Sequence, residues 1–274
     1  METRMRQRSG FTIVELLIAL FLAGIVTSAA LAIYATQNGQ LLVRDDGSEI
    51  EANLRAVAVE LTTQIRMAGY NVPEGISKLE GYDTNPDTIV VTFDSGTLEN
   101  VRIENAMPQP TAALQCEGHD LTGVYEGDWL FIYDPNTETG EFFEVTQILY
   151  SSCRILHDTM PLSKAYPAGS RILKLNRFKY YVDRSDSLHP YLMLSAPGLG
   201  NQIYAANITD LNVQYVLESG AVANVFPEAD MVREVVIDLA GLSDGTDHRS
   251  DTPYRTRDFV ARARTRNLGS QDKG

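Results

Sequence analysis

A single carboxylate, that of Glu15, interrupts an apolar run that extends from Ser9 to Ile33. A charged carboxylate inside a bilayer costs about 2.5 to 3.5 kcal/mol, and such residues usually face a partner. The chemistry open to Glu15 is therefore an ion pair or hydrogen bond that offsets this cost. The alternative is that Glu15, about 6 Å below Phe11 in a helix, reaches the membrane interface and stays hydrated.

The residues before the apolar run predict its orientation in a membrane. Residues 1–10 contain three arginines and only one acid. This excess of positive charge predicts that the N-terminus stays in the cytoplasm and that the chain after about residue 36 is exported. As a helix, residues 11–34 would extend roughly 36 Å, enough to cross a hydrocarbon core of about 30 Å. A secretory signal that is cleaved near residues 29–32 is the alternative.

The two cysteines, Cys116 and Cys153, would lie on the exported side, where oxidation favours a disulfide. A bridge would close a loop of about 38 residues and stabilise the fold by roughly 3 to 4 kcal/mol in the chain-entropy model. His119 and His157 follow the cysteines at spacings that also suit zinc, so a Cys2His2 site is the alternative. Because the compartment is oxidising and only two cysteines exist, we expect the disulfide and no metal.

Other constellations give weaker signals. Asp244, Asp247 and Asp251 form an acidic loop, but it lacks the spacing and the distal Glu of an EF-hand, so we interpret it as a solvated turn rather than a calcium site. The sequence contains no serine-hydrolase, metalloprotease, Walker or dinucleotide-binding motif. It therefore predicts neither enzyme activity nor a cofactor. The net charge of −13 argues against a nucleic acid as partner.

Gly10, Phe11 and Glu15 together resemble the signal of type IV prepilins and type II secretion pseudopilins, in which a glycine, an aromatic residue and an acid follow a basic leader. In that family the prepilin peptidase cleaves after the glycine, here between Gly10 and Phe11, and the new N-terminus is methylated. The resemblance implies that the Glu15 carboxylate pairs with the terminal amine of the adjoining subunit. Such a pair would neutralise both charges and fix the axial register of assembly.

A second helical pattern follows the apolar run. Apolar residues recur at helical spacing and form one stripe: Ile50, Leu54, Val57, Leu61 and Ile65. Ser48 would cap this helix, and Gly69 would end it. Residues 54–71 resemble the helix end of PilW-type minor pilins and J-type pseudopilins. We expect the stripe to pack against a sheet.

The rest of the chain predicts mostly strands. Residues 88–93 and 98–103 flank a turn signal and suggest one hairpin, and residues 128–133 and 141–148 suggest a second. The closing stretch, residues 259–268, alternates apolar and basic side chains, which indicates a half-buried strand. It also resembles the C-terminal strand of the PilW and J families.

These elements predict an α+β fold. The resemblance implies that the fold is type IV pilin-like, with a long helix on an antiparallel sheet. The expected division is a leader (1–10), a membrane-spanning helix (11–36), its amphipathic continuation (37–69) and a β-rich domain (70–274) with a small β subdomain inserted at about 120–175.

The resemblance implies a minor pilin of the PilW type in the initiation or tip complex of a type IV pilus. A J-type pseudopilin of type II secretion is the first alternative, and a membrane-tethered binding domain is the second. The implied partners are the prepilin peptidase, other minor pilins, the major pilin and the inner-membrane assembly platform, with membrane lipid around the helix before assembly. The protein would cross the inner membrane once, its N-terminus cytoplasmic and its globular domain periplasmic, and then reach the pilus and the cell surface.

Overall fold

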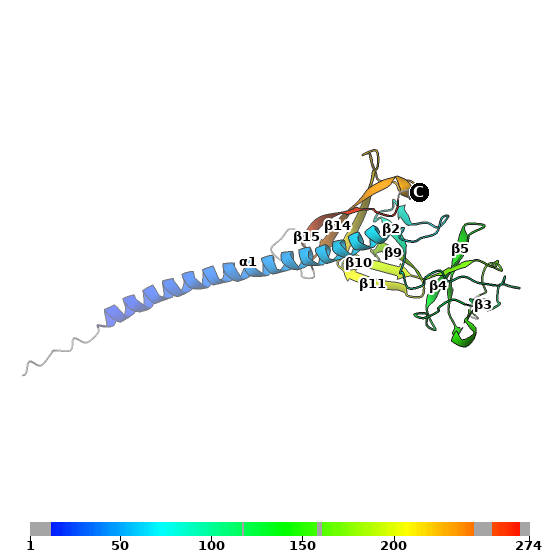
Figure 1. The fold of residues 1–274 in the computed structure, drawn as a ribbon. Coiled ribbons are helices and arrows are strands. Elements are labelled where there is room, and N and C mark those ends of the chain that lie inside the picture. Colours follow the sequence, from blue (N-terminus) through cyan, green and yellow to red (C-terminus); the bar gives the residue numbers. More distant parts are fainter. Residues whose placement is uncertain (1–11, 117, 158–160, 244–253, 269–274) are drawn as a thin grey trace, which may run out of the picture. The chain divides into compact units, whose positions relative to one another are not determined.

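The computed structural model describes residues 12–116, 118–157, 161–243 and 254–268. The chain divides into two units, residues 1–49 and residues 50–274. One helix, α1 (Ile13–Met67), begins in the first unit and ends in the second (Figure 1). The rest of the second unit is mostly strands, so the chain combines an N-terminal apolar helix with a β body, as the sequence predicted. Ser48 lies inside α1, and the predicted helix start at this residue is therefore wrong.

The first sheet of the second unit has five strands in the order β1-β2-β9-β10-β11, with every neighbouring pair antiparallel. The strands are β1 (Leu79–Tyr82), β2 (Thr88–Asp94), β9 (Leu175–Asp183), β10 (Tyr191–Ala196) and β11 (Gly200–Ala206). Strands β2 and β9 are neighbours in this sheet although they are distant in sequence. The predicted hairpin between residues 88–93 and 98–103 is therefore wrong, because β2 pairs with β1 and β9 instead.

The second sheet has four strands in the order β13-β12-β14-β15, again antiparallel. Its strands are β12 (Ile208–Leu217), β13 (Val222–Ala223), β14 (Val232–Leu242) and β15 (Thr256–Arg264), and the short helix η2 (Ala229–Met231) precedes β14. The alternation predicted for the last strand is confirmed. Phe259, Ala261 and Ala263 face the core, whereas Val260 and Arg262 are exposed.

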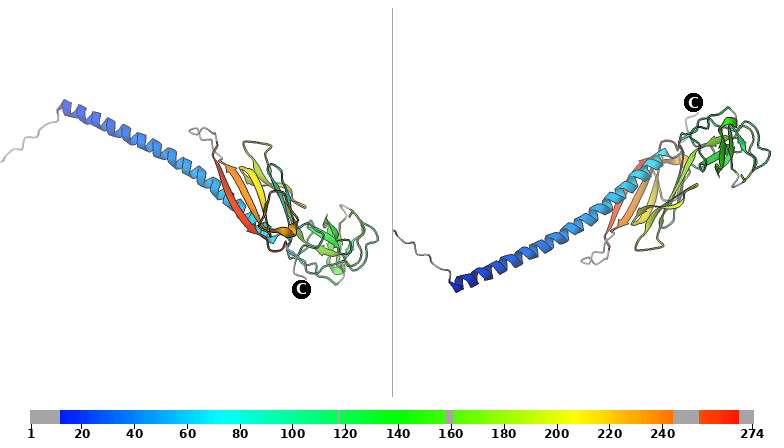
Figure 2. Two further views of the ribbon diagram at one scale, coloured as in Figure 1. Left: turned by 90° about the horizontal axis from the view of Figure 1, so that it is seen from above. Right: turned by 90° about the horizontal axis from the view of Figure 1, so that it is seen from below.

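One buried cluster joins the end of α1 to strands of both sheets. Figure 2 shows the end of α1 beside these strands. The five predicted stripe positions of the helix are all buried, with exposed fractions of 5% or less: Ile50, Leu54, Val57, Leu61 and Ile65. Their spacing places them on one helix face, and burial of this apolar face is what holds the last turns of α1 in the second unit.

The helix ends at Met67, and the predicted stop at Gly69 is confirmed. Gly69 has a φ of +80°, a conformation that glycine adopts without the steric penalty of other residues. A Cβ at this position would also lie 2.5 Å from the Asn267 carbonyl oxygen. The chain therefore needs glycine here both for the turn and for the close approach of the C-terminal segment.

A second group of strands lies between β2 and β9. It contains β3 (Leu114–Gln115), β4 (Trp129–Asp134), β5 (Thr139–Glu144), β6 (Gln147–Leu149), β7 (Arg154–Leu156) and β8 (Arg171–Leu173), with the short helix η1 (Tyr150–Ser152). They form two three-stranded sheets, β3-β7-β6 and β5-β4-β8. The pairing of β4 with β5 confirms the second predicted hairpin.

This group has its own buried cluster, which draws on residues from Leu98 to Ile172. The sequence placed the start of an insert near residue 120. Leu98, Val101 and Ile103, predicted to form a hairpin strand beside residues 88–93, are buried in this second cluster instead, and Arg102 forms an isolated β-bridge to Arg171. These three apolar residues thus belong to the cluster of the second group of strands and not to a strand paired with β2.

Candidate functional site

The start of α1 is closed by reciprocal hydrogen bonds between Thr12 and Glu15. The Thr12 N–H donates to Glu15 Oε2 at 3.0 Å, and the Glu15 N–H donates to Thr12 Oγ1 at 3.3 Å. The Thr12 hydroxyl adds a third bond, also to Oε2, at 3.0 Å. This arrangement is a capping box, which satisfies two N–H groups that the first turn of a helix would otherwise leave without partners. Sequence analysis missed Thr12, although the spacing of a threonine and a glutamate three residues later is the signal for this cap.

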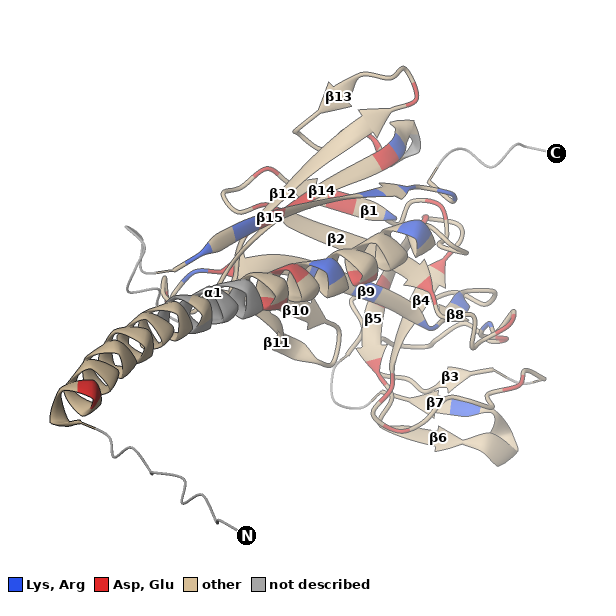
Figure 3. Ribbon diagram, turned by 90° about the vertical axis from the view of Figure 1, so that its left-hand side faces the viewer, with Lys and Arg blue, Asp and Glu red and all other residues tan. Residues whose placement is uncertain are grey.

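The cleavage position implied by the sequence, between Gly10 and Phe11, lies outside the described residues. Thr12, the first described residue, is the second residue after this position. Glu15 is the acidic residue of the first helical turn, and the sequence contains no charged residue from Leu16 to Val43. Figure 3 shows the first half of α1 with acidic colour only near its start. The only charge in this apolar segment therefore lies at its N-terminal end, where the partly positive helix terminus favours a carboxylate.

The helix beyond Glu15 is long and apolar enough to cross a membrane. This apolar segment, Ile13–Tyr34, has 22 residues, and the structure buries none of it. A helix of this length extends about 33 Å, close to the hydrocarbon thickness of a bilayer. Its large apolar side chains are exposed by 50% (Ile25) to 78% (Ile13). Such a continuous apolar surface needs lipid or other helices around it.

Two hydroxyl side chains in this segment form hydrogen bonds to main-chain carbonyls of the helix itself. The Thr27 hydroxyl donates to the Ala23 carbonyl at 2.8 Å, and the Ser28 hydroxyl donates to the Ile25 carbonyl at 2.9 Å. Hydroxyls that are paired in this way do not demand water, which a hydrocarbon environment cannot supply. The segment is thus compatible with lipid along its length.

Cys116 directly follows β3, and Cys153, which ends η1, directly precedes β7. The register of β3 and β7 ends at Gln115 and Arg154, and the Cys116 N–H donates to the Cys153 carbonyl at 2.8 Å, which extends the ladder by one pair. This hydrogen bond places the main chains of the two cysteines beside each other. The structure contains both cysteines as free thiols. Burial raises the pKa of the Cys116 thiol to about 12.

The two histidines that suggested zinc point to other partners. The ring of His157, which is buried, lies 3.0 Å from the Ala112 carbonyl, and the ring of His119 lies 2.8 Å from Glu104 Oε1. Across the described ranges, no group of three or more potential metal ligands is assembled. Cys116, His119, Cys153 and His157 are thus not gathered as one ligand group in this part of the chain. The acidic loop from Asp244 to Asp251 lies outside the described residues.

Comparison with known proteins identifies the N-terminal segment. Residues 5–31 match the family model described as the prokaryotic N-terminal methylation motif. Searches of curated proteins and of solved structures found no match to this chain. The motif supports a type IV pilin-like or pseudopilin-like protein that the prepilin peptidase processes, and it points to a structural protein rather than an enzyme.

Proposed function

We propose that this chain is a minor pilin that the prepilin peptidase cleaves between Gly10 and Phe11 and that then joins the initiation or tip complex of a type IV pilus. One observation carries the proposal. The methylation motif at residues 5–31 coincides with a helix whose first turn is closed by Thr12 and Glu15 and whose next turns are wholly apolar. Signal, cap and apolar helix thus lie in the order that cleavage and assembly require.

Glu15 has a defined part in this assembly. In the described part of the chain, the hydrogen bonds from Thr12 both go to Oε2 of Glu15, so Oε1 remains available to a further donor. A carboxylate has about four acceptor positions and can bind an ammonium group while keeping the cap. Cleavage creates such a group on Phe11. Oε1 of one subunit receives the Phe11 amine of the next, which neutralises both charges away from water.

The apolar helix exchanges one apolar environment for another during assembly. Before assembly its exposed side chains are in lipid, with the N-terminus in the cytoplasm and the β body in the periplasm. In the filament they contact the helices of the major pilin and of other minor pilins. Small residues along the segment, such as Ala19, Ala23 and Gly24, let these helices approach closely where lipid gives no hydrophobic drive.

The β body supports a place in the minor pilin complex rather than in a secretion pseudopilus. The chain is longer than the J-type pseudopilins it resembles, and the additional strands β3 to β8 with their own cluster supply much of this length. The segment Gly127–Trp129 at the start of β4 resembles the insert of PilW-type proteins. We further propose that Cys116 and Cys153 form a disulfide in the exported protein, which would tie η1 and β7 to β3.

The proposal is tested by following incorporation of Glu15→Ala. The wild-type chain, Glu15→Ala and the matched control Glu51→Ala would be quantified by mass spectrometry in the membrane and in sheared pili. Glu51 is an exposed helix acid outside the apolar segment. We expect Glu15→Ala to reach the membrane and be cleaved but to be absent from pili, whereas Glu51→Ala is incorporated normally. Normal incorporation of Glu15→Ala would contradict the assembly role, and a wild-type chain found only with a secretion complex would contradict the pilus.

A further inference from the structure

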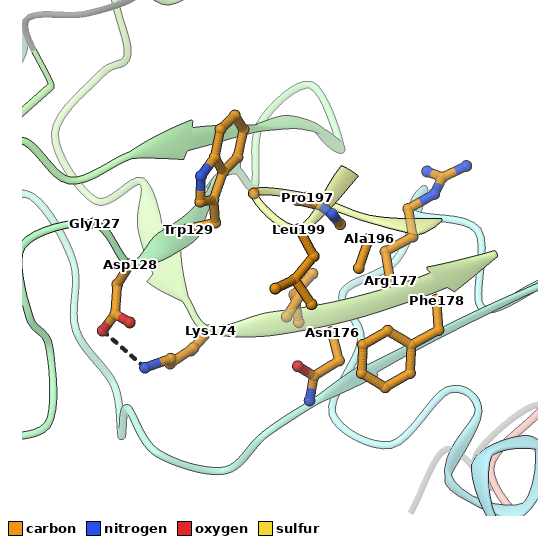
Figure 4. A pocket seen from close by; sticks show the side chains of 12 residues that line it. Gly127, Asp128, Trp129, Lys174, Asn176, Arg177, Phe178, Ala196, Pro197 and Leu199 are labelled. Carbon is orange, nitrogen blue, oxygen red and sulfur yellow. Dashed lines mark hydrogen bonds and ion pairs between the residues drawn. The ribbon is translucent and has the colours of Figure 1, made fainter. Parts of the chain in front are cut away.

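A pocket of about 200 Å³ lies against the edge of β9. Its lining includes four consecutive residues of this strand, from Leu175 to Phe178. Because side chains of a strand alternate between two faces, a pocket lined by four in succession lies along the edge of the strand rather than over one face. The other walls are the start of β4 at Gly127–Trp129 and the turn between β10 and β11 at Pro197–Leu199 (Figure 4).

The edge is open because β10 is shorter than β9. On one side β9 pairs with β2 as far as Leu175, but on the other side its register with β10 ends at Lys179. The β10 strand stops at Ala196, and the following turn leaves the sheet. In the described chain, β10 thus has no residue in register with Leu175 or Arg177. The edge of β9 is therefore unpaired by β10 at Leu175 and Arg177, where it faces the pocket.

The main-chain groups of Arg177 face the pocket and not β2. Its register partner on β2 is Thr92, whose N–H donates to the Lys78 carbonyl and whose carbonyl accepts from the Gly69 N–H. The Thr92 peptide groups therefore point away from β9. In an antiparallel pair of this kind, the opposite residue also directs its N–H and C=O outward.

Leu175 repeats the pattern two residues earlier. Its register partner is Asp94, whose N–H donates to the Tyr70 carbonyl and not to β9. The N–H and C=O groups of Arg177, and those of the buried Leu175, thus point toward the side of β9 on which the pocket lies. Main-chain pairing with such groups is how a peptide adds a strand to a sheet.

Part of the pocket lining is apolar or aromatic. Leu199, which is 55% exposed, points from the turn toward the strand that carries Asn176 (Figure 4). The turn itself lies against the indole of Trp129, since a Cβ on Gly198 would be 2.3 Å from Trp129 Cδ1. These surfaces suit an apolar side chain of an occupant.

The charge of the surroundings is positive on a chain whose net charge is −13. Lys174 pairs with Asp128 at 2.8 Å, and Arg177 pairs with Glu80 at 2.7 Å. Lys179 lies 5.3 Å from the Tyr181 ring centroid, and within the described ranges no carboxylate pairs with it.

A second hollow of about 460 Å³ is lined by Arg177 and Lys179, and it shares Arg177 and Pro197 with the pocket. The two hollows therefore meet at Arg177. An occupant that extends from the strand edge along the sheet enters a cationic environment, which favours acidic side chains.

We propose that the β9 edge at Leu175–Arg177 binds an extended acidic segment of a partner protein as an added strand. Its main chain pairs with the open edge, one apolar side chain lies against Leu199 and Trp129, and an acidic side chain contacts Lys179. That the segment belongs to another subunit of the filament complex follows from the proposed function. The binding of an extended acidic segment is argued from the pocket alone and does not depend on that function.

Trp129 is the only tryptophan of the chain, so its fluorescence reports on this pocket. The full-length protein in detergent would be titrated with a blocked hexapeptide of alternating leucine and aspartate. We expect a saturable change in emission, and binding at least about tenfold weaker for the same peptide with lysine in place of aspartate. Lys179→Glu should weaken binding of the acidic peptide about tenfold, whereas Arg154→Glu, an equal charge change on exposed β7, should leave it unaltered.

Strand addition is tested with two N-methylated versions of the acidic peptide. Methylation of one alternating set of amides should abolish binding, and methylation of the other set should preserve it, because only one set faces the sheet. Absence of any emission change, equal binding of acidic and basic peptides, or binding of both methylated peptides would overturn the inference. A processed, pilus-incorporated protein that fails this titration would contradict the inference alone. If the protein binds the acidic peptide but its leader is not removed, the proposed function is contradicted and the inference is not.

Discussion

Thr12 and Glu15 hold each other through their main-chain N–H groups and side-chain oxygens, at 3.0 and 3.3 Å, and so close the first turn of α1. The carboxylate that resembles an assembly residue is thus also a helix cap within its own chain. This double use explains how a single acid is tolerated at the end of an apolar helix: its charge faces N–H donors and the positive end of the helix. Under the proposed function, the cap also holds the carboxylate in place before a neighbouring subunit arrives.

Replacing Thr12 with valine should weaken assembly without abolishing it. Valine keeps the shape of threonine but removes the hydroxyl, so the Glu15 N–H loses its acceptor and Oε2 loses one donor. Loss of an N-cap side chain costs about 0.5 to 2 kcal/mol. We expect the amount of Thr12→Val in sheared pili to lie between those of wild type and Glu15→Ala. An amount equal to that of wild type would show that the cap has no part in positioning Glu15.

The cysteine pair should be oxidised in the exported protein. We expect the intact mass to be lower by two hydrogens than that of the reduced chain, with Cys116 and Cys153 in one cross-linked peptide after digestion. Reduction should lower the free energy of unfolding by roughly 3 to 4 kcal/mol, measured in urea, because the bridge restricts the unfolded chain. The double variant Cys116→Ala/Cys153→Ala serves as control, and reduction should not change its stability. Two free thiols in protein taken from the exported side would contradict the bridge.

The reduced protein should be sensitive to alkaline pH. Burial raises the pKa of Cys116 from an ordinary value of 9.0 to about 12. Because the folded-state pKa lies above that of the unfolded chain, this contribution to stability is fully present below about pH 9 and is lost as the pH rises toward 12. We expect reduced wild type to lose more stability than Cys116→Ala between pH 8 and pH 11 in urea titrations. Equal losses in the two proteins would show that Cys116 is not buried as a thiol.

Asp87 should be a strong determinant of stability because it joins the two large sheets. Its carboxylate, which is buried, accepts the Thr84 N–H at 3.1 Å and the Val213 N–H at 2.8 Å, and its own N–H donates to the Leu211 carbonyl. Asp87→Ala leaves the buried Val213 N–H without an acceptor, which costs about 1 to 3 kcal/mol. Urea unfolding would measure this loss. Asp83→Ala, in the neighbouring exposed loop, is the control and should change stability little.

Local patterns in the sequence predicted local structure. The spacing of Ile50, Leu54 and Val57 identified the buried helix face, and Gly69 marked its end, because periodicity and backbone conformation depend only on nearby residues. The alternation in β15 and the turn between β4 and β5 were predicted for the same reason. The capping box also has a local signal in the sequence, a threonine followed three residues later by a glutamate, although Thr12 was not among the predicted site residues.

Pairing between distant segments could not be read in this way. The pattern of residues 98–103 fits a strand, yet Leu98 and Ile103 contribute to the cluster of β3 to β8, since nothing local determines which core an apolar residue enters. The partner of β2 is β9, which follows only after the whole intervening group of strands. The open edge of β9 depends on where β10 ends in three dimensions, and no motif marks it.

Processing at the N-terminus is the claim on which the proposed function depends most directly. Mass spectrometry of the N-terminal peptide from membrane-bound and pilus-bound protein measures it. We predict a mature chain that begins with N-methylated Phe11 and retains Glu15 and the apolar helix. A mature chain that still carries residues 1–10, or one that begins near residue 33, would contradict this account.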